Sequence, residues 1–118
     1  MISKVREKLE TLDYLIDEQN LTIDRIDGST VLMKGNILFV NGFKLDFTEF
    51  KSPDNHDYRF HFMDENNQLV KRWDNSPHHD DVETFPDHVH TGNGVKCSEE
   101  KDLSEILDLV KELVLENI

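Results

Sequence analysis

The chain has 118 residues, which is the length of one domain. We therefore expect residues 1–118 to form a single domain without a separate regulatory module. Its 13 lysines and arginines against 25 aspartates and glutamates give a net charge of −12, which argues against broad contact with nucleic acid or anionic lipid. One cysteine, Cys97, excludes an internal disulfide, and no apolar run reaches the roughly 20 residues of a membrane span. We therefore expect a soluble, cytoplasmic protein with no membrane partner.

The first element in the chain is a helix. Apolar residues recur at spacings of three and four, which places them on one stripe of a helix over roughly residues 2–18. These residues are Ile2, Val5, Leu9, Leu12 and Ile16.

The middle of the chain changes to short stretches rich in β-branched and aromatic residues, which predict strands. Turn dipeptides at 27–28, 35–36 and 41–42 separate them, and Asn41-Gly42 predicts a two-residue hairpin. Two further strands are expected at 57–64 and 68–75. The predicted strands before them span 21–26, 29–35, 36–40 and 43–51.

Residues 74–94 predict a long ordered loop containing a short strand at 88–90, because glycine and proline interrupt any periodicity. A second helix follows, with a capped start at Ser98 and an apolar stripe from Leu103 to Val114. The fold class is therefore α+β, with a small antiparallel sheet of about five to seven strands between an N-terminal and a C-terminal helix.

The hairpin of 57–64 and 68–75 indicates a charged surface. A turn centred on residues 65–66 sets Arg59 opposite Arg72 and His61 opposite Val70 on one face. Two opposed arginines need a nearby carboxylate, for which Asp57 and Asp74 are the candidates, or an anionic ligand such as phosphate.

The stretch from 72 to 90, RWDNSPHHDDVETFPDHVH, contains four of the six histidines. If His78 and His79 return over the arginines and His61, the set can supply the base, acid and cations of metal-independent RNA cleavage. Alternatively, His88 and His90 with one of these histidines and an aspartate can bind zinc or manganese. The third interpretation is a structural loop, closed by an Asx-turn at Asp74.

Three other side chains receive simpler interpretations. Trp73 is expected in the core with Tyr58. Glu49 is either a carboxylate near the site or, as we favour, a surface charge at the end of a strand. Cys97 has no partner that would make it a nucleophile.

The stretches NGFKLDFTEF, YRFHFMDENNQLVKRWDNSPHH and TFPDHVH, followed by an amphipathic helix, resemble the TumE family of toxins from type II toxin–antitoxin systems. The resemblance spans about residues 36–115. The family's typical run combines a Y-x-Y-H strand with R-(Y/W)-D-N-A-P-H-H and F-P-H-H-x-H. Ser76 replaces the alanine here, and Asp87 stands where a histidine is common, which argues against a site made of four histidines.

The resemblance implies a toxin of RelE/ParE-like fold, neutralised by a cognate helix-turn-helix antitoxin. The expected activity is endoribonuclease action on RNA or the ribosome, without metal or cofactor. A homodimer is one expected assembly. The alternatives are a non-enzymatic inhibitor of a protein such as gyrase and a metal-binding module. The expected catalytic residues are His61, His78, His79, His88 and His90; the expected substrate-binding residues are Tyr58, Arg59, Arg72, Asp74 and Asn75.

Overall fold

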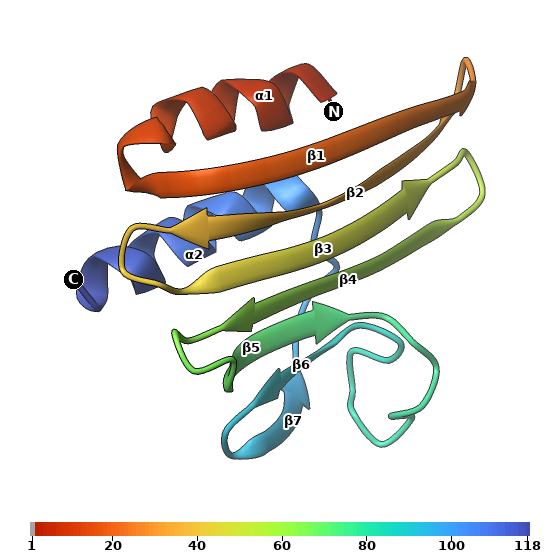
Figure 1. Ribbon diagram of the computed structural model, residues 1–118. Coiled ribbons are helices and arrows are strands. Elements are labelled where there is room, and N and C mark those ends of the chain that lie inside the picture. Colours follow the sequence, from red (N-terminus) through yellow and green to blue (C-terminus); the bar gives the residue numbers. More distant parts are fainter. Residues whose placement is uncertain (1) are drawn as a thin grey trace.

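The computed structural model describes residues 2–118, in which seven antiparallel strands form one sheet and each strand pairs with the next along the chain (Figure 1). Helix α1 (Ile2–Thr11) and a short 3-10 turn, η1 (Asp13–Leu15), precede the sheet, and helix α2 (Leu103–Glu116) follows it. This confirms the predicted α+β class. The strands are β1 (Ile16–Asp27), β2 (Thr30–Phe39), β3 (Lys44–Lys51), β4 (His56–Met63), β5 (Leu69–Asp74), β6 (His88–Thr91) and β7 (Gly94–Cys97).

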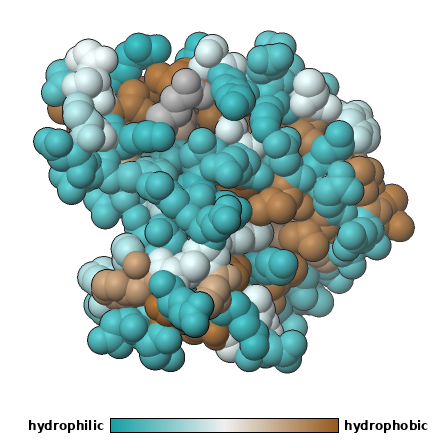
Figure 2. Space-filling model, turned by 180° about the vertical axis from the view of Figure 1, so that it is seen from behind, coloured by the Kyte–Doolittle hydropathy of each residue, from teal (hydrophilic) through white to brown (hydrophobic). Residues whose placement is uncertain are grey.

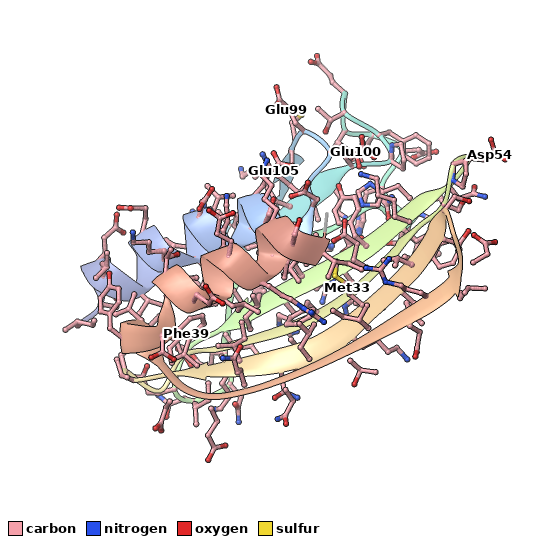
Figure 3. The ribbon with its side chains drawn as sticks, turned by 90° about the horizontal axis from the view of Figure 1, so that it is seen from above. Met33, Phe39, Asp54, Glu99, Glu100 and Glu105 are labelled. Carbon is pink, nitrogen blue, oxygen red and sulfur yellow. The ribbon has the colours of Figure 1, made fainter. Side chains whose placement is uncertain are left out.

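Both helices lie on one face of the sheet, and the hydrophobic core fills the space between (Figures 1 and 3). Met33 and Phe39 of β2, labelled in Figure 3, are buried on this face, as is Ile106 of α2. An ion pair between Lys8 and Asp108 joins the two helices. No helix of residues 2–118 covers the other face of the sheet, which we call the open face.

The N-terminal helix is shorter than its apolar spacing predicts. It ends at Thr11, and the chain then turns through η1, so Ile16 begins β1 and does not extend the helix. The backbone N–H of Val40 donates to the carbonyl of Leu15 at 2.9 Å, which ties the turn to the sheet. Ile16 still packs against the core, so the apolar spacing reports burial correctly but not the secondary structure.

The hairpin at Asn41-Gly42 is confirmed, but its loop has three residues and not the predicted two, counted between the hydrogen-bonded residues Phe39 and Phe43. The N–H of Phe39 donates to the carbonyl of Phe43 at 2.8 Å, and Gly42 has a φ of 89°, which favours glycine. The dipeptide at 35–36 is not a turn, because it lies inside β2. A Cβ on Gly35 would approach the carbonyl oxygen of Asn20 to 2.0 Å, so close packing requires this glycine.

The register of β4 and β5 differs from the predicted one. Arg59 lies opposite Asp74 and His61 lies opposite Arg72, a shift of two residues. The reason is a longer turn, in which the N–H of Asp64 donates to the carbonyl of Gln68 and the strands carry a bulge. A shift of two residues keeps Arg59, His61 and Arg72 on their predicted face, whereas Val70, beside the bulge, packs against the core.

The last part of the chain contains one strand more than predicted. The expected short strand is β6, but it pairs with β7, which was not foreseen. Helix α2 begins at Leu103 and not near Ser98, because Asp102 caps it in a reciprocal capping box with Glu105. Within residues 2–118 no helix has both the length and the apolarity to cross a membrane.

Exposed apolar side chains gather at one end of the helical side, where α2 ends (Figure 2). Tyr14, Val40 and Ile118 each expose more than half of their surface. The turn that carries Val40 lies beside the C-terminus, because the side chain of Asn41 donates to the carbonyl of Asn117.

Candidate functional site

Strand alternation brings the predicted cationic residues to the open face. Phe60 and Trp73 are buried on the helical side, so their neighbours Arg59, His61 and Arg72 project to the opposite side. Trp73 is in the core, as predicted.

A groove crosses the open face. Two adjoining hollows share Thr48 and Arg59; one also contains Lys34 and His61, and the other contains Arg72. Because the hollows share these residues, we treat them as one groove.

His61 lies between two guanidinium groups in this groove. Partial burial lowers the pKa of His61, and the positive charges of Arg59 and Arg72 lower it further, against a smaller opposite effect of Asp46. The imidazole is therefore neutral near pH 7 and can accept a proton.

The two arginines differ in their partners. Arg72 donates from Nε to Oδ2 of Asp74 at 3.3 Å, so the expected carboxylate beside an arginine is present. Arg59 makes no ion pair within residues 2–118, and its side chain is exposed on the groove. A free guanidinium is suited to bind an anionic ligand such as a phosphate.

Three of the predicted histidines meet at one end of the groove. His88 and His90 project from β6, and His79 reaches them from the loop after β5, with ring centroids 4.8 Å from His88 and 5.1 Å from His90. We call His79, His88 and His90 the histidine cluster. The Nε2 atoms of His88 and His90 lie 3.1 Å apart.

Asp74 faces the histidine cluster from β5. Its Oδ1 lies 2.9 Å from Nε2 of His88, and its Oδ2 lies 3.3 Å from Nε2 of His90. Burial would raise the pKa of Asp74, but hydrogen bonds from the Ser76 hydroxyl and N–H, together with the histidines, lower it overall. The bond to the Ser76 N–H forms the predicted Asx-turn.

His78 does not join this cluster. Its side chain is exposed on the loop, although it is the neighbour of His79 in the sequence. Alternation alone could not distinguish the two histidines, because both lie in a loop.

Tyr58 and Asn75, two predicted substrate-binding residues, have structural partners. The buried Tyr58 donates its hydroxyl to Asp87 at 2.6 Å, and burial followed by this carboxylate raises the pKa of the phenol. Asn75 accepts the N–H of Tyr58 and donates to the carbonyl of His56 at 2.6 Å, so it extends the β4–β5 pairing by one side chain. The aspartate at 87 therefore anchors the loop.

A buried acid was missed by the sequence interpretation. Glu49 is fully buried, so the prediction of a surface charge is wrong. Its Oε1 accepts the N–H of Leu103 at 3.0 Å, and its Oε2 lies 2.6 Å from Nε2 of His56. Nδ1 of His56 in turn lies 2.6 Å from Glu100, which Figure 3 labels beside the start of α2.

Burial and these contacts shift the pKa values of Glu49 and His56. Burial raises the pKa of Glu49, partly offset by the bonds from His56 and Leu103. Burial alone would lower the pKa of His56, but the bonds to Glu100 and Glu49 and their negative charges raise it overall. Since Leu45 and Phe47 alternate with Glu49 in the strand, its buried position could have been read from parity.

Comparison with protein families decides the assignment that the sequence resemblance suggested. The model of the family described as "Toxin TumE" matches residues 5–118. The chain belongs to the TumE toxin family. It is thus a toxin of a toxin–antitoxin system, and a TumE toxin has an antitoxin partner. Comparisons with curated proteins and with solved structures gave no match.

Proposed function

We propose that this TumE toxin stops growth as a cytoplasmic endoribonuclease whose substrate, messenger or ribosomal RNA, binds in the groove. The observation that carries the proposal is the row of Arg59, His61 and Arg72 on the open face, beside the histidine cluster. This row offers a neutral base beside two cations, a combination suited to phosphoryl transfer in a phosphodiester.

The proposed reaction uses the ribose as its own nucleophile. His61 accepts the proton of the 2′-hydroxyl, whose oxygen attacks the adjacent phosphorus while the bond from phosphorus to the 5′ oxygen breaks. The products are a 2′,3′-cyclic phosphate and a 5′-hydroxyl, and the leaving oxygen takes its proton from the histidine cluster. Arg59 and Arg72 stabilise the charge that develops on the phosphate.

The net charge of −12 requires the cationic residues to act locally. The groove contains Lys34, Arg59 and Arg72 beside Asp46, Asp57 and Asp74, so its own formal charge is balanced. This supports binding of a short single-stranded segment, for which contacts to two phosphates give a salt slope of only about −1.4.

Induction in growing cells tests this activity. We expect His61→Ala and Arg59→Ala to restore growth and to remove the new 5′-hydroxyl RNA ends that the wild-type chain produces. Arg25→Ala, an exposed arginine of β1, is the matched control and should remain toxic. Intact RNA with accumulating broken DNA on induction would instead favour a gyrase-type target.

We also propose a RelE/ParE-like relationship and a helix-turn-helix antitoxin. The antiparallel sheet with a helix at each end supports the first. The acidity of the chain supports the second, because DNA-binding partners are basic. The apolar side chains around Val40 offer a surface for protein contact, so Val40→Glu should weaken neutralisation by the antitoxin and leave toxicity intact.

A further inference from the structure

Three histidines beside the groove have the spacing of a metal site, and Asp74 adjoins two of them. The nitrogen atoms that His79, His88 and His90 can offer all lie within 4.8 Å of one another. The separations of 2.9, 3.1 and 3.3 Å among Asp74, His88 and His90 are closer still. A tetrahedral ion with bonds of about 2.0–2.1 Å holds its ligand atoms about 3.3 Å apart, which is close to these values.

The directions of the hydrogen bonds to His88 and His90 also favour a metal site. Nδ1 of His88 lies 2.8 Å from the carbonyl oxygen of Pro86, which can only accept, so the proton of a neutral ring is on Nδ1. Its Nε2 then presents a lone pair to Asp74 and His90. Arg72 donates from Nη2 to Nε2 of His90 at 3.2 Å, so this nitrogen is also an acceptor. In this tautomer the two Nε2 lone pairs and the Asp74 carboxylate converge, and Arg72 is the cationic side chain that donates to two of them, so a metal cation can take its place at His90.

The surroundings hold these acceptors in place. His88 is fully buried and fixed by the Pro86 carbonyl, as metal-binding histidines usually are by a second hydrogen bond. Asp74 is held by Ser76 at 2.8 Å and by Arg72. His79 and His90 are only partly buried, so solvent reaches the cluster.

We propose that Asp74 and the histidine cluster bind one first-row divalent transition-metal ion, with Zn²⁺ as the ion to test. Three imidazoles and one carboxylate suit zinc and its neighbours, whereas magnesium and calcium prefer oxygen ligands alone. On binding, Arg72 gives up its contact with His90 and keeps Asp74. In the RNA cleavage proposed above, and resting on it, the ion would take a water as a fifth ligand, and this water, in place of the histidine cluster, would be the acid for the leaving oxygen.

The experiment measures metal binding to the full chain without any RNA. The protein carries Cys97→Ser and no polyhistidine tag, because an exposed thiol and a tag both bind zinc. After removal of metal with a chelator, titration calorimetry with Zn²⁺ should give one site. Co²⁺ should give the visible absorption of a tetrahedral complex, which reports the geometry independently of activity.

The variants separate a built site from general histidine binding. Loss of an outer contact alone costs about 10–100-fold in metal affinity, so His79→Ala should weaken Zn²⁺ binding at least about 100-fold. His78→Ala is the matched control and should bind like the wild type, since its side chain is exposed beside the cluster. Asp74→Asn, which preserves shape, should also weaken binding, and circular dichroism checks that each variant folds.

Two results would overturn the inference: folded wild-type protein that binds less than about a tenth of an equivalent of Zn²⁺, or equal losses in His78→Ala and His79→Ala. The test also separates the two proposals. Metal binding without RNA cleavage refutes the ribonuclease alone, and RNA cleavage by protein that binds no metal refutes the metal site alone.

Discussion

The hydrogen-bonded row of Glu49, His56 and Glu100, which runs from the core to the surface, gives the sharpest test of the fold. Glu49 is fully buried, and His56 is its only cationic partner, at 2.6 Å, among residues 2–118. Replacing His56 with alanine leaves the carboxylate with a single hydrogen bond, from the N–H of Leu103. Removal of one partner from a buried ion pair costs about 3–5 kcal/mol, which for a chain of this length lowers Tm by roughly 10–20 °C.

The same substitution should change how stability depends on pH. The folded-state pKa of His56 is raised, so its contribution is complete below the unfolded value of about 6.5 and is lost as pH rises through the folded value. The destabilisation caused by His56→Ala should therefore be largest near pH 6 and shrink toward pH 9. Besides Glu49 and Glu100, the titratable neighbours are Tyr58, with ring centroids 5.1 Å apart, and Lys51, which lies opposite in β3.

Thermal and urea unfolding followed by circular dichroism measures both effects. His78→Ala is the control, because removal of an exposed histidine should change the free energy of unfolding by no more than about 0.5 kcal/mol. The reasoning is refuted if His56→Ala and His78→Ala unfold at the same temperature, or if the difference between His56→Ala and wild type does not change with pH.

Three further outcomes are expected. Gly35→Ala should lower the free energy of unfolding by about 1–3 kcal/mol or more, since the added Cβ meets the Asn20 carbonyl at 2.0 Å, whereas Gly28→Ala, with open space around it, should cost less; urea titration compares them. Asn75→Ala removes two bonds to the backbone of β4 and should cost about 2–3 kcal/mol in the same assay. Binding of single-stranded RNA by the His61→Ala chain, which we expect not to cleave it, should have a salt slope near −1.4, and adding Arg59→Ala should reduce its magnitude by about 0.7; an unchanged slope would exclude Arg59 from phosphate contact.

The sequence predicted the sides of the sheet better than the pairs across it. Alternation in β4 and β5 correctly separated Phe60 and Trp73 from His61 and Arg72. The register depends on the turn, where Asn67 adopts a φ of 63° and a bulge follows, and no local pattern fixes such a loop length. The predicted register was wrong by two residues, and because side chains alternate with a period of two, His61 and Arg72 still lie on the predicted face.

The candidate site was predictable in its composition but not in its contacts. The histidine-rich stretch contains His79, His88 and His90, whose side chains meet in the structure. What the sequence could not supply was the path of the loop, which decides that His79 and not His78 meets the other two. It also could not show that Asp74 would face them, because this follows from the pairing of Asp74 with His88 across β5 and β6.

Neighbouring residues of the family motif that starts at Arg72 have different structural roles. Arg72 lines the groove, Trp73 enters the core, Asp74 faces the histidine cluster, and Asn75 bonds the backbone of β4. Ser76 then fixes the carboxylate of Asp74 with two hydrogen bonds. Substitutions one position apart in this motif should therefore fail for different reasons: those at Trp73 and Asn75 by unfolding, and those at Arg72 and Asp74 by loss of the site in a folded chain. Loss of toxicity alone does not distinguish these causes, so each variant of the motif needs its free energy of unfolding measured beside its effect on growth.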